Sequence, residues 1–494
     1  MKIAFVSSEV VPYAKTGGLG DVSGSLPVEL SRSGHDVKVF MPKYNIIPEE
    51  YELHPVDGLN KMTILCNGKG YNVSVYSGAM PESRATIYFI DCPHYFSRPE
   101  LYTEDPDEDE RFILFSKSVI EALQLFRWAP DILHCNDWQT GLIPLLLREN
   151  YGWDKIFDST ATVFTIHNIA YQGIFPKESF TKAGINEKHA LYGGPGEFFG
   201  KISFMKTAIS TSDILNTVSK TYAEELLTSE FGAGLDGCLK ARRDTFLGIL
   251  NGVDYNIWNP GRDIYIANQY SASDLPDKTK NKKALLERLN LPYSEKRPLI
   301  GMVSRIVEQK GFDLIIEALD ELIRLDAQWI ILGSGHKEYE NILASLAKKL
   351  PAKVSFHIGY NDELAHCIEA GADIFLMPSR FEPCGLNQIY SLKYGTVPVV
   401  RKTGGLADTV EDWNSLILRG FDTGTGFSFT EYNTKALVDT VKRALNMFQE
   451  KKTWTKIQTN GMNKNYSWKT SAEKYIRLYE RAIILRKEKR AHFR

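Results

Sequence analysis

The segment from Ala372 to Gly395 constrains the fold more than any other part of this sequence. It begins with ADIFLM, a short apolar run typical of a strand buried on both faces of a parallel sheet. It ends with LNQIYSLKYG, whose apolar spacing and final glycine predict a helix. The loop between them, PSRFEPCG, contains two prolines and follows the carboxyl end of a strand, where open α/β sheets bind ligands. The loop is therefore either a binding site or an ordinary strand-to-helix turn.

The same order of strand, loop and helix recurs along the chain and predicts parallel sheets. Predicted strands include MKIAFVSSE, HDVKVFMP, DILHCN and ATVFTI in the first half. In the second half, LIGMVS, AQWIILGSG, KVSFHIGY and TVPVVRKTGG are predicted as strands that each lead into a loop. A polar, turn-rich stretch at 271–283 separates the two series. We expect an α/β protein with doubly wound domains at 1–250 and 251–470. We also expect a terminal helix over 471–494, and one option is that it folds back onto the first domain.

The composition excludes several classes of function. A chain of 494 residues is too long for one core, and its 59 Lys and Arg nearly balance 61 Asp and Glu, so no basic field favours nucleic acid or membrane. No apolar run approaches a membrane span, and the N-terminal apolar run is too short for a signal peptide. The six cysteines form no CxxC motif and no metal-ligand spacing, which favours reduced thiols in the cytoplasm and no metal site.

Two charged stretches interrupt this regular pattern. Residues 93–112 are aromatic and then strongly acidic, and we expect them to form a long exposed loop. Its DPD and DED strings mimic a metal-binding motif, but their position in a loop favours solvated carboxylates. The basic end of the last helix is likewise expected to be a solvated face.

A seven-residue string occurs in each expected domain. KTGGLGD spans 15–21 and KTGGLAD spans 402–408, and each lies between a predicted strand and a predicted helix. Both copies are therefore expected to offer backbone amides and a lysine to an anion. Neither contains the GxGxxG spacing of a dinucleotide site or the GK[ST] ending of a Walker loop.

An ordered set of motifs gives the chain a family resemblance. KTGGLGDV, HCNDWQTG, TIHNIAYQG, GKISFMKTAI, NGVD, SRIVEQKG, PSRFEPCGL and KTGGLADTV resemble bacterial glycogen synthases and plant starch synthases over essentially the whole chain. The resemblance implies two facing Rossmann-like domains, the GT-B fold, with the active site in the interdomain cleft. It also implies a retaining transfer of glucose from ADP-glucose to the non-reducing end of an α-1,4-glucan, without a metal or other cofactor.

The resemblance also implies roles for individual residues. A diphosphate that leaves without a metal needs fixed cations, and Arg305 and Lys310 resemble the family's pair. With them, His167 and Glu382 resemble residues at the reacting glucose. Asp21 either contacts the acceptor or caps the helix that follows. The full expected set adds donor-binding Lys15, Gly18, Asn251, Tyr360, Cys384, Gly385 and Leu386, and acceptor-binding Asp21, Asp137 and Trp138.

Two departures and three alternatives accompany this interpretation. Related transferases often carry a second glutamate where this chain has Tyr390, and the acidic 93–112 segment matches the family's acceptor loop poorly. One alternative is a related transferase that uses UDP-glucose or a small sugar acceptor. A nicotinamide-dependent oxidoreductase would require the missing glycine spacing. A non-catalytic glucan-binding protein would not need Lys15, Arg305, Lys310 and Glu382 together.

Overall fold

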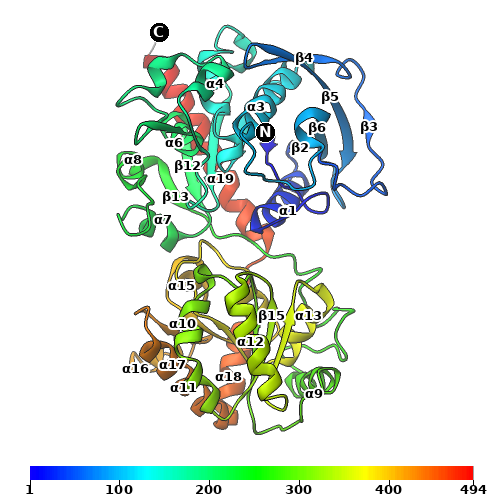
Figure 1. Ribbon diagram of the computed structural model, residues 1–494, viewed down its shortest axis with the longest axis vertical. Coiled ribbons are helices and arrows are strands. Elements are labelled where there is room, and N and C mark those ends of the chain that lie inside the picture. The colour runs from blue at the N-terminus through cyan, green and yellow to red at the C-terminus, as the bar shows by residue number, and fades with distance from the viewer. Residues whose placement is uncertain (493–494) are drawn as a thin grey trace. The chain divides into compact units, whose positions relative to one another are not determined.

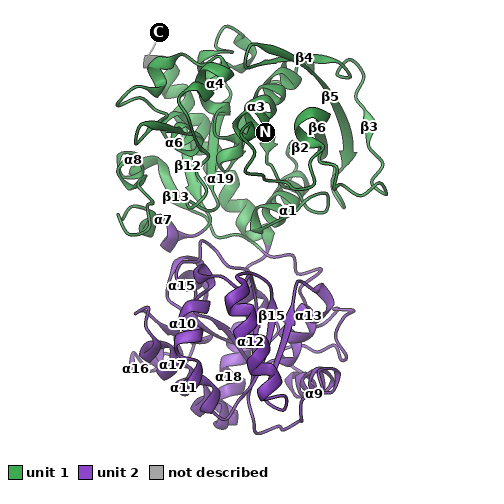
Figure 2. Cartoon of the chain, viewed as in Figure 1, with its two compact units in different colours: residues 1–218, 223–252, 468–494 green, residues 219–222, 253–467 purple. Residues whose placement is uncertain are grey.

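A computed structural model describes residues 1–492 of the chain. The chain divides into two compact units (Figure 2). Unit 1 comprises Met1–Val218, Ala223–Gly252 and Trp468–Arg494, and unit 2 comprises Ser219–Tyr222 and Val253–Ser467. None of the helices in the described residues is long and apolar enough to cross a membrane.

Unit 1 is built on a mixed, mainly parallel sheet. Its strand order is β13-β12-β8-β7-β1-β2-β6-β5-β3, with β4 also paired to β5. The strands from β13 to β6 run parallel, and β5 is antiparallel to β6, β3 and β4. The bounds are β1 (Lys2–Val6), β2 (Asp36–Pro42), β3 (His54–Pro55), β4 (Met62–Cys66), β5 (Lys69–Ala79), β6 (Thr86–Asp91), β7 (Ile132–Asn136), β8 (Ala161–Ile166), β12 (Ile214–Thr217) and β13 (Phe246–Gly248). Every residue of β7 and β8 is buried, as expected for strands covered on both faces.

The remaining elements of unit 1 cover and extend this sheet (Figure 1). A small antiparallel sheet joins β10 (Glu197–Phe198), β11 (Lys201–Ser203) and β9 (Ile174–Phe175). The helices are α1 (Gly18–Arg32), α2 (Pro93–Phe96), α3 (Glu108–Leu125), α4 (Ile143–Glu149), α5 (Glu178–Ala183), α6 (Phe204–Thr211), α8 (Asp236–Ala241) and α19 (Trp468–His492), while α7 (Lys220–Leu226) contains residues of both units.

Helix α19 is an integral part of unit 1. The hydroxyl of Tyr479 lies 2.8 Å from Nδ1 of the fully buried His134 on β7. Burial lowers the pKa of His134 to about 3, so its ring is neutral and the contact is an uncharged hydrogen bond. The basic end of the helix is exposed at Lys487 and Lys489, as predicted for a solvated face, but it also forms ion pairs that the sequence did not predict. Lys489 pairs with the buried Asp213 at 3.1 Å, and Arg490 pairs with Asp158 at 3.3 Å.

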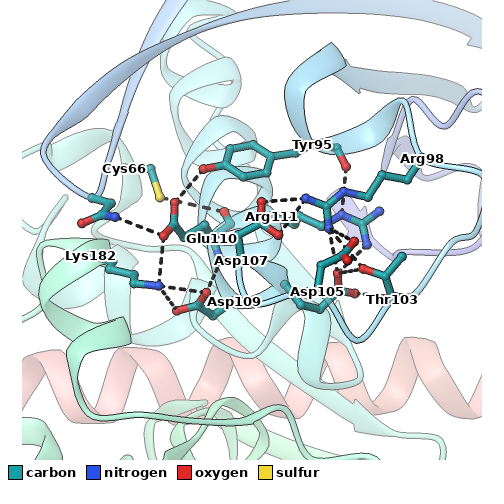
Figure 3. Close-up of polar contacts among 12 residues, drawn as sticks. Cys66, Tyr95, Arg98, Thr103, Asp105, Asp107, Asp109, Glu110, Arg111 and Lys182 are labelled. Atoms are coloured by element: carbon teal, nitrogen blue, oxygen red, sulfur yellow. Dashed lines mark hydrogen bonds and ion pairs between the residues drawn. The ribbon is translucent and has the colours of Figure 1, made fainter.

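The acidic segment at 93–112 also differs from its prediction. It was expected to be an exposed loop, yet α3 begins at Glu108, and residues 108–111 are buried. These charges tolerate burial because they are paired: Arg111 lies 2.6 Å from Glu108, and Lys182 of α5 lies 3.0 Å from Asp109. Figure 3 shows Lys182 pointing toward Asp109. Paired charges lose far less free energy on burial than isolated ones. The sequence pattern could not identify these partners, one of which is distant along the chain.

Unit 2 contains a six-stranded, fully parallel sheet. The strands are β14 (Leu299–Val303), β15 (Gln328–Gly333), β16 (Val354–Ile358), β17 (Ile374–Met377), β18 (Val397–Arg401) and β19 (Phe427–Phe429), in the order β16-β15-β14-β17-β18-β19. The helices are α9 (Lys278–Arg288), α10 (Phe312–Glu317), α11 (Leu319–Arg324), α12 (Lys337–Lys349), α13 (Asp362–Gly371), α14 (Asn387–Lys393), α15 (Gly404–Thr409), α16 (Trp413–Leu418), α17 (Thr434–Gln449) and α18 (Lys451–Met462).

Both faces of the unit 2 sheet pack against helices. Along β15, Trp329 and Ile331 belong to one buried core cluster, and Ile330 and Leu332 belong to another. Successive side chains of a strand point to opposite faces, so the two clusters are the two layers of a doubly wound fold. This arrangement leaves the ends of the strands as the places where polar side chains can gather.

Candidate active site

The expected site residues gather at the same kind of position in each unit. In unit 1, β1 pairs with both β2 and β7, so the strand order reverses beside β1. In unit 2, β14 pairs with both β15 and β17. Ligands of open α/β sheets bind at the carboxyl ends of strands beside such a reversal. The loops after β1, β7, β14 and β17 contain most of the residues predicted from the sequence.

In unit 2, the structure brings Lys310 and Glu382 together. The Lys310 ammonium lies 2.6 Å from Oε2 of Glu382, and both side chains are largely buried. Ser379 donates a second hydrogen bond to the same oxygen at 3.0 Å. Among the described residues, no side chain or backbone amide donates to the other oxygen, Oε1. The sequence predicted two separate roles, whereas the structure shows a charge pair with one carboxylate oxygen left to accept a ligand hydroxyl.

Backbone contacts fix the position of this pair. The turn that carries Lys310 ends at Gly311, whose φ is +80°, and a Cβ there would lie 2.2 Å from the carbonyl oxygen of Pro378. The amide of Arg380 donates to the carbonyl of Gln309 at 2.9 Å, which ties the two loops together. Arg305 is exposed and donates to the side chain of Gln309 at 2.9 Å. Arg305 and Lys310 therefore both belong to a turn held against the Glu382 loop.

The second KTGG string, residues 402–408, packs against the backbone of the Glu382 loop. A Cβ on Gly404 would lie 1.9 Å from the carbonyl oxygen of Glu382, and one on Gly405 would lie 1.9 Å from that of Cys384. The amide of Gly405 also donates to the carbonyl of Glu382 at 3.1 Å. These glycines therefore allow backbone to pack on backbone. We predicted that this copy offers its amides to an anion, but the amide of Gly405 donates to a carbonyl of the protein instead.

A buried glutamine braces the other side of the same loop. Gln388 donates to the carbonyls of Cys384 and Gly385 at 3.0 Å each. Gly385 has a φ of +68°, a conformation that favours glycine, and Leu386 is the N-cap residue of α14. Sequence analysis assigned no role to Gln388. In the sequence alone, a glutamine on the buried face of a short helix looks the same as a glutamine on the surface, so Gln388 could not be identified without the structure.

Two tyrosines near this site occupy different environments. Tyr360, which follows β16, is 73% exposed, and its hydroxyl lies 2.5 Å from Oδ1 of Asp362. Tyr390, which replaces the second glutamate of related transferases, stacks on Trp258 with ring centroids 3.9 Å apart. The opposite face of Trp258 stacks on His366 at 3.8 Å. Tyr390 is therefore part of an aromatic stack in this chain.

In unit 1, Asp137 follows β7 in a strained backbone conformation. Its φ is +54° and its ψ is −179°, which costs a non-glycine residue on the order of 1–3 kcal/mol. Its Oδ1 accepts a hydrogen bond from the amide of His167 at 2.7 Å. The pKa of Asp137 is raised to about 7, mainly by burial and to a smaller extent by the charge of Glu9, while backbone hydrogen bonds from His167 and Asn168 oppose the rise. Such a perturbed carboxyl beside a histidine is typical of functional sites.

The neighbours of His167 determine its tautomer. The side-chain amide of Asn136 donates to the carbonyl of Val6 at 3.0 Å, so its Oδ1 faces His167 Nε2 at 2.9 Å. Oδ1 can only accept, so Nε2 carries the proton and Nδ1 retains its lone pair. Burial lowers the pKa of His167 to about 3, so the ring is neutral at physiological pH. Within the described residues, the buried Nδ1 has no hydrogen-bond partner. It is an acceptor available to a ligand hydroxyl.

The first KTGG string is organised by Glu9, a residue that sequence analysis missed. The amides of Thr16 and Gly17 donate to Glu9 Oε2 at 2.7 and 3.0 Å. Two of the amides that we expected to be offered to an anion are therefore occupied by a carboxylate of the protein. Lys15 pairs with Asp21 at 2.7 Å, and the N-cap of α1 is Gly17, which has no side-chain cap.

The remaining expected residues of unit 1 lie at strand ends but are mostly covered. Trp138 packs edge-on against Phe112, with centroids 4.9 Å apart, and a Cβ on Gly173 would lie 2.4 Å from its ring. Asn251 follows β13 and is buried, and its Oδ1 has no partner among residues 1–492. Gly18 begins α1, and a Cβ there would meet no protein atom within 4 Å. The roles of these three residues stay predictions.

Comparison with known proteins identifies the family. The family profile described as the starch synthase catalytic domain matches residues 2–241, and the profile of glycosyl transferases group 1 matches residues 286–461. Glycogen synthase of Koribacter versatilis is 45% identical, with 98% of this chain and 99% of that protein covered. Glycogen synthase of Thermotoga maritima is 43% identical, with the same shares covered. The chain belongs to the glycogen synthase and starch synthase family.

Solved structures place the fold in the same family. The catalytic domain of starch synthase IV from Arabidopsis thaliana, bound to ADP and acarbose, matches with a TM-score of 0.90 and 33% identity, covering 98% of this chain and 99% of that one. Sucrose-phosphate synthase from Thermosynechococcus elongatus has a TM-score of 0.60 at 17% identity, covers 97% of this chain and 98% of that one, and shares only the fold. The predicted GT-B class of two Rossmann-like domains is confirmed, and the protein is a glucosyltransferase of the glycogen synthase type.

Two further observations concern metals and thiols. Within the described part of the chain, no group of three or more His, Cys, Asp or Glu side chains is placed to hold a metal ion. Within residues 1–492, the six cysteines form no disulfide, and Cys384 in the Glu382 loop is buried.

Proposed function

We propose that this glucosyltransferase moves glucose from ADP-glucose to the non-reducing end of an α-1,4-glucan, with retention of the α configuration, in the cytoplasm. The observation that carries the proposal is the Lys310–Glu382 pair at the strand reversal of unit 2, with Arg305 on the adjoining turn. A cation and a carboxylate at one point suit a ligand that has a diphosphate attached to a sugar. The Arabidopsis relative, solved with ADP and acarbose, supports both the nucleotide and the glucan parts.

In this proposal, unit 2 binds the donor. Arg305 and Lys310 hold the diphosphate, and Glu382 accepts hydrogen bonds from glucose hydroxyls through Oε1. Cys384, Gly385 and Leu386 provide a loop whose shape is fixed by Gln388 and the second KTGG string. The exposed ring of Tyr360 is proposed to contact the base.

Unit 1 supplies the remaining groups. The unprotonated Nδ1 of His167 accepts from a hydroxyl of the reacting glucose, and Asp137 positions this histidine through its backbone amide. Lys15, Gly18 and Asn251 are proposed to contact the donor, and Asp21, Asp137 and Trp138 to contact the acceptor. A neutral histidine and a buried aspartate with a raised pKa suit recognition of uncharged sugar hydroxyls.

The proposed reaction needs no glucosyl-enzyme intermediate. The bond between the anomeric carbon and the β-phosphate oxygen breaks, and the acceptor hydroxyl attacks from the same face. The acceptor proton passes to the departing phosphate oxygen, so atoms and charge balance. Negative charge develops on the diphosphate as the bond breaks, and preorganised cations stabilise it. Removing either Arg305 or Lys310 is expected to lower the rate roughly 10²- to 10³-fold.

The test is incubation with radiolabelled ADP-glucose and a glycogen primer, followed by digestion of the product to establish its linkage. Parallel reactions contain labelled UDP-glucose, no primer, or EDTA. We expect primer-dependent α-1,4 extension, preference for ADP-glucose and an unchanged rate with EDTA. Preference for UDP-glucose or transfer to a small sugar would favour the related-transferase alternative. Loss of the rate with EDTA and its recovery with Mg²⁺ would overturn the metal-free mechanism.

A further inference from the structure

Glu9 is a buried carboxylate that no proposed step uses. It is 3% exposed and lies just beyond β1. Its Oε2 accepts from the amides of Thr16 and Gly17 at 2.7 and 3.0 Å, and its Oε1 accepts from the hydroxyl of Thr16 at 2.6 Å. A buried charge with this many donors is stabilised and held in one orientation. These hydrogen bonds fix the position of the backbone at residues 16 and 17 relative to Glu9.

This backbone leads directly to Lys15. The side chain of Lys15 lies over Gly20, where a Cβ would approach its Cβ and Cγ to 3.1 Å, and reaches Asp21 at 2.7 Å. Helix α1 begins at Gly18, two residues after the first amide that Glu9 holds. A shift of Thr16 and Gly17 would therefore move Lys15 relative to the helix that bears Asp21.

A second contact holds Glu9 itself. The hydroxyl of Tyr102 donates to Glu9 Oε1 at 2.7 Å and lies 2.8 Å from the hydroxyl of Ser8. Tyr102 belongs to the acidic segment, where the adjacent Thr103 donates to Glu108 at 2.8 Å, at the start of α3. The segment that the sequence predicted as an exposed loop therefore connects the buried ion pairs of α3 to the loop of Lys15.

We propose that Glu9 is a positioning residue for the transfer, which acts by holding the backbone of Thr16 and Gly17 so that Lys15 is presented to the donor. This inference rests on the donor-binding role proposed for Lys15. Glu9 also influences the neighbouring site residue Asp137, because its charge is one cause of the raised pKa of that carboxyl. Glu9 is not proposed to contact substrate.

Three variants separate hydrogen bonding from general stability. Glu9→Ala removes every contact. Glu9→Gln keeps an oxygen for the two amides, and its NH₂ group can donate to the hydroxyls of Thr16 and Tyr102, which also accept. The control is Asp213→Asn, because Asp213 is equally buried in unit 1 and accepts from the amide and hydroxyl of Thr162 at 2.9 and 3.0 Å, before the start of β12. Glu9→Asp, which is too short to hold both groups of donors, replaces Glu9→Ala if that variant fails to fold.

Amide hydrogen exchange reports the loop without any requirement for activity. We expect Glu9→Ala to accelerate exchange at Thr16 and Gly17, with Glu9→Gln and Asp213→Asn close to wild type at these amides. Unchanged exchange in Glu9→Ala, or equal acceleration in Asp213→Asn, would overturn the proposal. If the wild-type protein transfers no glucose, the proposed function fails, and the exchange result alone decides whether Glu9 holds the loop.

Kinetics then test whether Glu9 acts through Lys15. Glu9→Ala is expected to lower kcat/KM for the donor roughly 10- to 100-fold, an effect that a misplacement of about 1 Å can produce. Glu9→Gln should restore most of this loss. In a Lys15→Ala background, Glu9→Ala should change kcat/KM less than about twofold, because residues that act through one group are not additive. Multiplicative losses in the double variant would show that Glu9 acts independently of Lys15 and would refute the proposal.

Discussion

The two KTGG strings have nearly the same sequence but opposite environments. In the first copy, a Cβ on Gly17 or Gly18 would meet no protein atom within 4 Å. In the second copy, a Cβ on Gly404 or Gly405 would lie 1.9 Å from a carbonyl oxygen of the Glu382 loop. The protein's own packing thus requires glycine only in the second copy.

The charged ends of the two strings differ as well. Lys15 pairs with Asp21 within the first copy. In the second copy, Lys402 forms no ion pair with any described residue, and Asp408 instead accepts from the amides of Lys220 and Thr221 at 2.7 and 3.0 Å. The first copy therefore holds a lysine near open space, whereas the second holds backbone together. A shared string indicates a shared strand-to-helix turn, and its surroundings determine which atoms are available for function.

The largest expected effect is at Glu382, which the second copy supports. Glu382→Ala should lower turnover by a factor on the order of 10² to 10⁴, because a contact to the reacting sugar is lost. ADP should bind no more weakly, since the same change releases Lys310 from its pair at 2.6 Å. Steady-state kinetics and calorimetry with ADP measure the two quantities.

Ser379→Ala is the matched control for Glu382. It removes one hydrogen bond of 3.0 Å to the same carboxylate oxygen and leaves Lys310 in place, so turnover should fall far less. A folded Glu382→Ala variant with near-normal turnover would contradict the assignment of Glu382 to the donor glucose.

The next effect compares a glycine from each string. Gly405→Ala forces a Cβ against the carbonyl oxygen of Cys384 and should lower the free energy of unfolding by about 3 kcal/mol or more. Gly17→Ala meets no such contact, and a cost below about 1 kcal/mol is expected from the loss of a glycine N-cap. Thermal and denaturant unfolding decide between them. Equal destabilisation by the two substitutions would show that the two strings do not differ in their need for glycine.

The sequence predicted the strand-to-helix turns better than the contacts within them. The apolar run ending at Met377 and the helix after it were expected and are present as β17 and α14. These features depend on local pattern and turn chemistry. Glu9 was missed because its partners, Thr16, Gly17 and Tyr102, are specified only by the folded chain.

Burial of charge was the feature predicted least well. An acidic string such as residues 108–110 normally indicates a solvated surface, and its burial here depends partly on Lys182, which is distant along the chain. The same reasoning applies to the buried Asp213, whose partner Lys489 on α19 is far away in the sequence. Local pattern gives no information about such pairs.

Another expected effect on stability depends on pH and comes from the titration of Asp137. Burial raises the pKa of Asp137 to about 7 in the folded protein, above the ordinary value of 3.8 that applies when the chain unfolds. Between about pH 4 and pH 7, the unfolded chain therefore loses this proton while the folded protein keeps it, so stability falls as pH rises. Asp137→Asn removes this titration and should stabilise the protein by about 4 kcal/mol at pH 8, with no gain near pH 4. Denaturant unfolding across this pH range measures the difference, and a gain independent of pH would contradict the raised pKa.

The smallest expected effect comes from exchanging the sixth residue of the strings, which is Gly20 in the first and Ala407 in the second. Ala407→Gly should cost about 1 kcal/mol from helix propensity in α15 and leave turnover unchanged. Gly20→Ala gains a similar propensity term in α1, but its Cβ approaches the Lys15 side chain to 3.1 Å and must displace it. The two terms should nearly cancel in stability, while the altered Lys15 should raise the KM for the donor about threefold. Unfolding and donor saturation curves of both variants test this pair. An unchanged donor KM in Gly20→Ala would mean that the position of Lys15 over Gly20 does not matter for binding, and the first string would then have the same purely structural role as the second.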